Sequence, residues 1–424
     1  MSLLITNARL VDPEAGSEEL GSVLIDEGQI AEVNGGAQGN TVLDACGKYL
    51  APGIVDIGVK VCEPGERHKE SSRSAGVAAA RGGVTTMVTR PDTTPTIDSP
   101  EQLEFVARRA ADVAPVRVLP MAALTKGRQG NEMVEVGFLQ DAGAVAFTDC
   151  DHVIADSKVF SRCLTYTRAL GALVMAHPQE PVLSHGAAAT SGKFASLKGI
   201  PAVSPMAERM GLERDLALVE VTGARYHADA ISTLNALGPL RRAKKAGLDV
   251  TAGVNVHHLT LNEFDVGDYR TFFKLKPPLR SETDREALVA AVQDGLIDII
   301  SSMHTPQDEE SKRLPFEVAA SGAVGLETLL PAALQLFHSG ELTLPHLFRA
   351  MSLNPSKRLG LETGKIAAGA PADLVLFDPH APFVLDRFKL ASKSKNTPFD
   401  GARLQGRVLK TWVAGREVFP GETV

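Results

Sequence analysis

The stretch Ile54-Val55-Asp56-Ile57 is the first of eight short apolar runs that recur along the middle of the chain. Helix signals lie between the runs. Ser99-Pro100-Glu101-Gln102 places a capping serine before a proline, and Ser281 opens a stretch that reaches Gln293 and ends before Gly295. The eight runs are Ile54–Ile57, Val84–Thr89, Val116–Leu124, Ala144–Thr148, Ala172–Ala176, Arg225–Ala230, Asp249–Val254 and Leu296–Ser301. Buried strands that alternate with helices predict an α/β protein with a (β/α)8 barrel, although periodicity alone also allows a doubly wound sheet.

Both ends of the chain show a different pattern, that of strands joined by tight turns. Val23–Val33 reads as a hairpin around Asp26-Glu27-Gly28, and Val408–Phe419 reads as another around Ala414-Gly415-Arg416. Asp373–Asp378 adds a further strand. We therefore predict a small β-sandwich formed by residues 1–52 and 362–424, with the barrel in residues 53–361.

Composition and charge exclude several classes of protein. The 424 residues are 44% hydrophobic with a net charge of −7, which is typical of a globular protein and argues against nucleic acid or membrane as a partner. The four cysteines lie far apart without a Cys-x-x-Cys pair, which predicts neither a disulfide framework nor a zinc finger. Together with the absence of a long apolar run or a signal peptide pattern, this predicts a cytoplasmic protein.

In a (β/α)8 barrel, the residues that follow each strand meet at one face, where active sites form. The residues that follow the runs here include Gly58 and Lys60, Asp92, Asp149-Cys150-Asp151, His177, Ala230, His257-His258 and Met303-His304. A catalytic zinc ion needs three or more His, Asp or Glu ligands that converge on one point. These strand ends therefore form a poor set for a metal-dependent hydrolase.

Several segments carry a family pattern in the order of the chain. They are Pro52-Gly53-Ile54-Val55-Asp56, Glu63-Pro64-Gly65, Gly82-Gly83-Val84-Thr85-Thr86, Pro91-Asp92-Thr93, Pro277-Pro278-Leu279-Arg280 and Asn396-Thr397-Pro398-Phe399. With them, the chain from Leu3 to Phe419 resembles the dihydroorotases of the amidohydrolase superfamily. The resemblance implies a barrel that uses zinc to hydrolyse a C–N bond in a cyclic amide.

The chain departs from the family pattern at the positions that hold metal and substrate. The family's His-x-His-x-Arg reads Gly58-Val59-Lys60-Val61-Cys62, and its Asp-His-Ala-Pro-His reads Met303-His304-Thr305-Pro306-Gln307. A metal-ligating aspartate aligns with Cys150 and a histidine with Ala230, while the two substrate-binding asparagines align with Asp92 and Lys276. Only His177 keeps a ligand position. We expect no catalytic residue, zinc ion or other cofactor at the degenerate positions Gly58, Lys60, Cys62, Asp92, Cys150, His177, Ala230, Lys276, Met303 and Gln307.

Lys60 opposes a metal ion by its charge. Two unit charges about 4 Å apart repel by roughly 4 kcal/mol at an effective dielectric constant of 20, and a divalent ion feels about twice that repulsion. A neutral Lys60 would escape it. For an anionic ligand, Cys62 lacks the arginine fork and Asp92 adds a negative charge, whereas Lys60 and Lys276 add positive potential.

A frame that keeps its helix caps and terminal strands while losing its ligands favours a scaffold. The resemblance offers a precedent: a non-catalytic dihydroorotase-like chain that assembles with the catalytic chain of aspartate transcarbamoylase. We predict such a subunit, in a homo- or hetero-oligomer of pyrimidine biosynthesis. The alternative is an active divergent dihydroorotase or other cyclic amidohydrolase, with a site rebuilt around His177, Cys150 and His304. A third hypothesis, a small-molecule sensor, rests only on Lys60 and Lys276.

Overall fold

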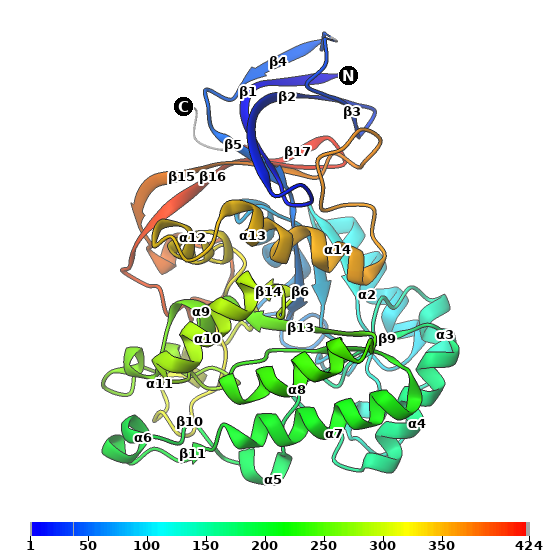
Figure 1. The fold of residues 1–424 in the computed structure, drawn as a ribbon, viewed down its shortest axis with the longest axis vertical. Helices are drawn as coiled ribbons and strands as arrows, with labels where there is room; N and C mark the ends of the chain where they lie inside the picture. Colours follow the sequence, from blue (N-terminus) through cyan, green and yellow to red (C-terminus); the bar gives the residue numbers. More distant parts are fainter. Residues whose placement is uncertain (1, 37, 421–424) are drawn as a thin grey trace.

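Strands from both ends of the chain pair in one sheet, which lies above the barrel in Figure 1. The computed structural model describes residues 2–36 and 38–420. The sheet has eight strands, with β17-β16-β15-β5-β1-β2-β3 in sequence and β4 paired to β1. Their bounds are β1 Leu3–Asp12, β2 Ser17–Asp26, β3 Gln29–Val33, β4 Thr41–Asp44, β5 Tyr49–Pro52, β15 Leu374–Val384, β16 Arg403–Val413 and β17 Arg416–Pro420. The predicted β domain from both chain ends is confirmed.

The junction between the two ends is the pairing of β5 with β15. The strands run antiparallel, with Leu374 opposite Pro52 and Phe377 opposite Tyr49. Side chains of β15 alternate between two cores, as the period of a strand requires. Leu374 and Leu376 pack with Trp412 inside the β domain, whereas Val375 and Phe377 join the core of the barrel. One strand therefore fastens the β domain to the barrel.

The barrel strands follow the predicted apolar runs. They are β6 Ile54–Val59, β7 Val84–Thr89, β8 Arg117–Pro120, β9 Leu173–Ala176, β12 Arg225–Ala228, β13 Val250–Asn255 and β14 Ile299–Ser301. All their ladders are parallel. The backbone N–H of Lys60 donates to the carbonyl of His304 at 2.9 Å, which joins the β6 end to the segment after β14. The (β/α)8 barrel is thereby confirmed over the doubly wound sheet.

The fourth apolar run takes its predicted place between the third and fifth strands through isolated bridges and backbone hydrogen bonds. Val145 donates to the carbonyl of Pro120 at 3.1 Å, and Phe147 donates to the carbonyl of Leu173 at 2.9 Å. Phe147 bridges Ala122 on one side and Val174 on the other. After the run, the Asp149 carboxylate accepts the backbone N–H groups of Leu124 and Thr125, each at 3.0 Å, which ties the end of the run to the loop after β8.

Helices surround the barrel, and their starts agree in part with the predicted caps. The longer ones are α1 Ser72–Arg81, α2 Pro100–Val113, α4 Ser157–Ala169, α7 Met206–Thr222, α8 Leu234–Lys245, α10 Glu282–Gln293 and α12 Leu329–His338. Ser281 caps α10 by accepting the Asp284 N–H. Ser99 precedes α2 but makes no side-chain cap bond. Instead, the Gln102 side chain accepts the Asp98 N–H at 3.1 Å.

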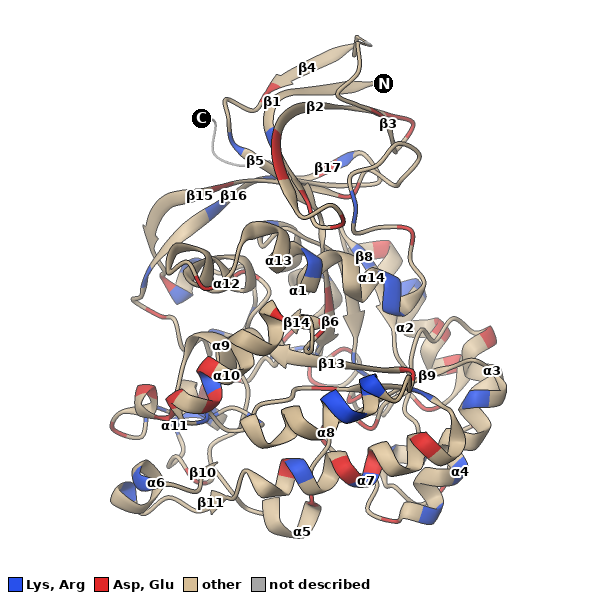
Figure 2. Cartoon of the chain, in the orientation of Figure 1, with Lys and Arg blue, Asp and Glu red and all other residues tan. Residues whose placement is uncertain are grey.

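The charged side chains of the outer helices are of both signs. Figure 2 shows acidic residues on α7 beside basic residues on α8, where Arg242 pairs with Glu213 at 2.9 Å. All four cysteines are free thiols. Among the described residues, no helix is long and apolar enough to cross a membrane.

Two of the family-like segments hold the loops at the barrel mouth. Arg280 of the Pro-Pro-Leu-Arg segment is buried against Glu208 and donates to Ser232 Oγ at 3.0 Å. Asn396 of the Asn-Thr-Pro-Phe segment donates to the carbonyls of Thr305 and Gly322 at 3.1 and 3.0 Å. Buried polar residues with several partners each fix these loops in one position.

Candidate functional site

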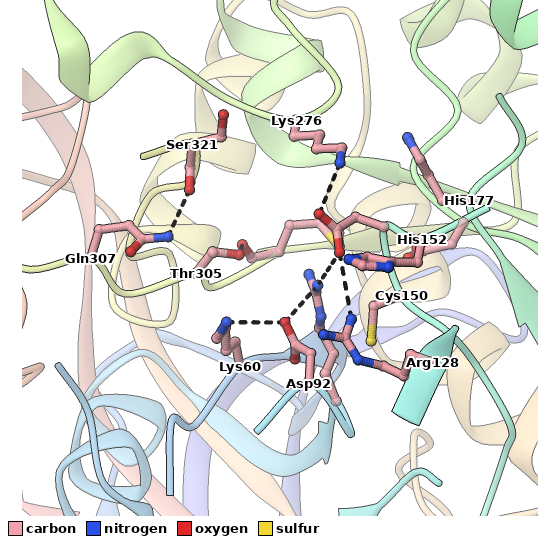
Figure 3. A pocket seen from close by; sticks show the side chains of 15 residues that line it. Lys60, Asp92, Arg128, Cys150, His152, His177, Lys276, Thr305, Gln307 and Ser321 are labelled. Atoms are coloured by element: carbon pink, nitrogen blue, oxygen red, sulfur yellow. Dashed lines mark hydrogen bonds and ion pairs between the residues drawn. The ribbon is translucent and has the colours of Figure 1, made fainter. Parts of the chain in front are cut away.

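A polar cavity of about 240 Å³ opens at the carboxyl ends of the barrel strands. We call it the barrel mouth (Figure 3). Most of the positions singled out in the sequence line it, namely Lys60, Asp92, Cys150, His177, Lys276, Met303 and Gln307. Gly58, Cys62 and Ala230 are not part of its lining. Folding therefore brings most of the degenerate positions together in one place.

Lys60 and Asp92 form an ion pair in the mouth. Lys60 Nζ lies 3.1 Å from Asp92 Oδ2, and the same oxygen accepts a hydrogen bond from Arg90 Nη2 at 2.9 Å. Both side chains are largely buried. Burial opposes the charge of Lys60, but the Asp92 carboxylate outweighs it and raises the pKa of the ammonium. The surroundings of Lys60 therefore favour the ammonium, whereas a metal ligand would have to be the neutral amine.

Asp151 is the second centre of charge in the mouth. Its carboxylate lies 3.0 Å from Lys276 Nζ, 3.7 Å from Arg128 Nη1 and 3.8 Å from Arg90 Nη2. Burial opposes the charge, but Arg90 and Lys276 hold the pKa of Asp151 well below its usual range. Two carboxylates and four cations thus form a connected network across the mouth.

His177 and Cys150, which both line the mouth, are neutral. Burial lowers the pKa of His177 to about 3, so the imidazole carries no charge at neutral pH. Burial raises the pKa of Cys150 to about 12, with the Asp92 carboxylate acting in the same direction. Since a thiolate is the nucleophilic form, the hypothesis of a thiolate site at Cys150 finds no support in its surroundings.

The backbone at five of the ten degenerate positions has a positive φ. Cys62, Cys150, Ala230 and Met303 have φ values of 61°, 58°, 54° and 45°, and Gly58 has 92°. Such values are uncommon for residues other than glycine and gather at functional sites. The chain therefore keeps a strained frame at strand ends whose side chains have changed.

Three further histidines are buried away from the mouth. His304 Nδ1 accepts the Gly325 N–H at 3.1 Å, and its Nε2 lies 3.4 Å from Glu70 Oε2. His257 bonds Asn255 Oδ1 at 2.7 Å, and His258 bonds the carbonyl of Pro278 at 3.1 Å. These contacts place all three in the packing of the loops, and His304 does not join His177 and Cys150 in a rebuilt site.

The donor set does not fit the zinc centre that the resemblance implies. Across residues 2–36 and 38–420, no three His, Cys, Asp or Glu side chains gather so as to hold a metal ion. In the mouth, the imidazoles of His152 and His177 and the carboxylates of Asp92, Asp151 and Asp229 are the candidate donors. The carboxylates of Asp92 and Asp151 are taken up by lysine and arginine side chains. A divalent cation would have to displace these partners.

Sequence reasoning missed Arg90, Arg128 and Asp229, which also line the mouth. Arg90 directly follows the second predicted strand, and Asp229 is the residue before Ala230 in the sixth run, so position was a usable signal for both. Arg128 lies in a loop beyond the third strand, at the end of the short 3-10 helix Lys126–Arg128. Only the folded structure brings it to the mouth.

The barrel, the terminal β domain and the polar mouth together define a protein of the cyclic amidohydrolase class. The profile of the family described as "Dihydro-orotase-like" matches residues 47–236, and that of the "Amidohydrolase family" matches residues 318–419. The sequence is 38% identical to a dihydroorotase of Pelobacter propionicus, over 99% of this chain and 100% of the relative. It is 37% identical to a dihydroorotase of Bacillus licheniformis over 99% of this chain and 98% of the relative. The chain belongs to the dihydroorotase family.

Solved structures agree with the fold. The L-hydantoinase of Arthrobacter aurescens superimposes with a TM-score of 0.90 at 24% identity, covering 100% of this chain and 97% of that one. The dihydropyrimidinase of Brevibacillus agri gives a TM-score of 0.87 at 21% identity, covering 100% and 96%. At these identities the likeness concerns the architecture of barrel and β domain.

Proposed function

We propose that this member of the dihydroorotase family carries out no zinc-dependent hydrolysis and holds no resident cofactor. In this proposal it serves pyrimidine biosynthesis as a non-catalytic subunit that assembles with the catalytic chain of aspartate transcarbamoylase. The observation that supports it is the Lys60–Asp92 ion pair. It lies where the resemblance places a metal-ligating histidine and a substrate-binding asparagine.

The retained frame supports a role for the shape of the molecule. The barrel, the β domain and the loop-holding residues Arg280 and Asn396 are intact. The backbone at Cys150 and Met303 is left-handed, a conformation that the surrounding structure has to hold in place. A protein that needs no chemistry at the strand ends, but must present a dihydroorotase-like surface to a partner, would keep these features while its ligands diverge.

The relatives favour a second candidate. They are named dihydroorotases without qualification, at 37–38% identity over nearly the whole chain. On the names alone, the comparisons support an active dihydroorotase, or another hydrolase of cyclic amides, better than they support a scaffold. Such an enzyme would have to bind its substrate among Lys60, Asp92 and Asp151 without the family's ligand set.

One preparation tests both candidates. The full chain is mixed at micromolar concentration with the aspartate transcarbamoylase catalytic chain of the same organism, and the mixture is analysed by size-exclusion chromatography with light scattering. Co-elution in one species of combined mass is the expected result, and two separate peaks would contradict the scaffold. The same sample, incubated with zinc and desalted, is measured for metal content and dihydroorotate turnover. Stoichiometric zinc with turnover would establish the second candidate instead.

A further inference from the structure

Helix α7 (Met206–Thr222) carries apolar side chains on two faces. Its inner face is buried against the barrel, and α4 and α8 are its neighbours in the outer layer. On the outer face an apolar stripe lies in solvent, with Met210 at 47% and Val221 at 83% exposure. We call it the outer stripe, and its members are Met206, Met210, Ala217 and Val221. Since a helix that is apolar all round is normally buried, this exposed face indicates that another surface covers it.

The spacing of the outer stripe is the same when it is read from either end. The steps are four, seven and four residues, and each step returns the side chain to nearly the same direction, because successive residues of an α-helix turn by about 100°. When α7 of a second copy lies antiparallel across the stripe, with Met210 opposite Ala217 of the second copy, Met206 comes opposite Val221 of that copy. The stripe is therefore complementary to itself, as an interface with two-fold symmetry requires.

Charged residues beside the outer stripe follow the same symmetry. Glu213 pairs with Arg242 of α8 at 2.9 Å and with Arg209 at 3.2 Å, so Arg209 lies on the side of α7 that faces α8. Glu220 comes eleven residues after Arg209, about three turns, and lies on the same side. Glu220 is exposed and forms no ion pair with another described residue. In the antiparallel arrangement, each Arg209 lies within one turn of Glu220 of the second copy, which gives one pair of opposite charges at each end of the contact.

Helix α5 (Pro181–Ser184) widens the apolar surface at the start of α7. The backbone N–H of Glu180 donates to the carbonyl of Ala207 at 2.8 Å, which holds α5 against this end of α7. Val182 is 80% exposed and Leu183 is 50% exposed. A stable interface buries about 1,200–2,000 Å² in total, and α5 of each copy adds to the area that the two α7 helices bury.

We propose that two copies of this chain form a dimer through the outer stripe, with the two α7 helices packed antiparallel about a two-fold axis. Ala217 is small and lets the helices approach, while the flexible side chain of Met210 opposite it fills the remaining space. Figure 1 shows α7 in the lower part of the molecule, at the end far from β4. The inference goes beyond the proposed function, because the partner is a second copy, and it holds whether or not the chain assembles with aspartate transcarbamoylase.

The mass of the full chain alone in solution tests the proposal, by sedimentation velocity at micromolar concentration. Wild type is expected to have twice the mass of one chain. Met210→Glu keeps a good helix former but buries charge at the contact, and it should weaken association about a hundredfold. Val221→Lys, which suits the end of a helix, should also dissociate the dimer. The matched control is Val42→Lys on β4, where the valine is 61% exposed, and it should leave the dimer intact.

A charge exchange tests the antiparallel register. Glu220→Arg brings two arginines together in the contact and should weaken the dimer about tenfold, and Arg209→Glu in the same chain should recover most of the affinity. A wild-type chain that stays monomeric overturns the proposal. A dimer that Met210→Glu and Val221→Lys leave intact, or that Val42→Lys dissociates as they do, overturns it as well. No recovery in the double variant would overturn the antiparallel arrangement.

Discussion

Lys60 Nζ and Asp92 Oδ2 lie 3.1 Å apart, and this contact places a pair of opposite charges at two positions where the resemblance implies a histidine and an asparagine. Asp92 also binds Arg90 at 2.9 Å, so one carboxylate serves two largely buried cations. The two partners are therefore unequal. Removal of the lysine leaves Asp92 paired, whereas removal of the aspartate leaves two cations with less compensation.

Asp92→Ala should destabilise the fold more than Lys60→Met. Breaking a buried ion pair by removing one partner costs about 3–5 kcal/mol, and we expect Asp92→Ala to lie near the lower figure because Lys60 is partly hydrated. Lys60→Met should cost about 1 kcal/mol, since Arg90 still satisfies the carboxylate. Urea unfolding of both variants measures the difference. Equal costs, or the reverse order, would show that the pair is not the centre of the network.

The left-handed backbone at Ala230 predicts an unusual response to glycine. Ala228 and Ala230 are 0% and 2% exposed, but only Ala230 has a positive φ, at 54°. At Ala228, glycine loses a buried methyl group and adds backbone entropy, which together cost about 1–2 kcal/mol. At Ala230, the same losses are offset by relief of about 1–2 kcal/mol of left-handed strain. Chemical denaturation should find Ala230→Gly close to wild type and Ala228→Gly clearly destabilised.

Stability should fall between pH 6.5 and pH 5. Burial lowers the pKa of four histidines, to about 3 in His177, His227 and His257 and to about 4 in His258. Below pH 6.5 these histidines are protonated in the unfolded chain but not in the folded chain. Each of them therefore lowers the free energy of unfolding by up to about 1.4 kcal/mol per pH unit.

Three buried carboxyl groups with strongly raised pKa values act in the opposite direction. Burial raises the pKa of Asp56 and of Asp229 to about 6 and that of Glu327 to about 7, so the folded state takes up these protons before the unfolded state does. The four histidines outnumber these carboxyl groups, so the free energy of unfolding should be larger near neutral pH than at pH 5. Urea unfolding at several pH values measures it, and His227→Gln should reduce the slope by up to one proton. A free energy of unfolding that is constant or larger at pH 5 would contradict this assignment.

The cysteines should differ sharply in reactivity. Cys46 is exposed, whereas the other three are buried and burial raises the pKa of each of these thiols to about 12. We expect iodoacetamide to label Cys46 alone in the native chain at pH 8, and all four in denaturant, as read by peptide mass spectrometry. Rapid labelling of Cys150 in the native chain would revive the thiolate hypothesis for the mouth.

The order of the barrel strands was predictable because each apolar run is long enough to form a buried strand and is bounded by turn or cap residues. Ala144–Thr148 is one such run, since Val145 donates to the carbonyl of Pro120 and Phe147 donates to the carbonyl of Leu173, as a strand between two neighbours requires. The Asp149 carboxylate that follows the run accepts the backbone N–H groups of Leu124 and Thr125, and a contact of this kind leaves no trace in the period of a sequence.

The positions of the site were predictable in part, and its interactions were not. Strand-end placement pointed to Lys60, Asp92 and His177, and it could have pointed to Arg90 and Asp229. Arg128 and Lys276 reach the mouth from loops whose course depends on buried contacts such as that of Arg280 with Glu208. The role of Asp151 as a shared anion depends on which side chains turn inward, and that is decided only when the loops pack.

The pairing of β5 with β15 has a consequence for synthesis on the ribosome. Tyr49–Pro52 emerges early, yet its partner begins only at Leu374. Throughout the intervening period β5 presents an unpaired edge, which is a template for pairing with other chains. Contacts so distant in sequence also form slowly. A nascent or truncated chain that ends before β15 should therefore depend on chaperones to remain in solution, and the emergence of residues 374–420 completes the sheet.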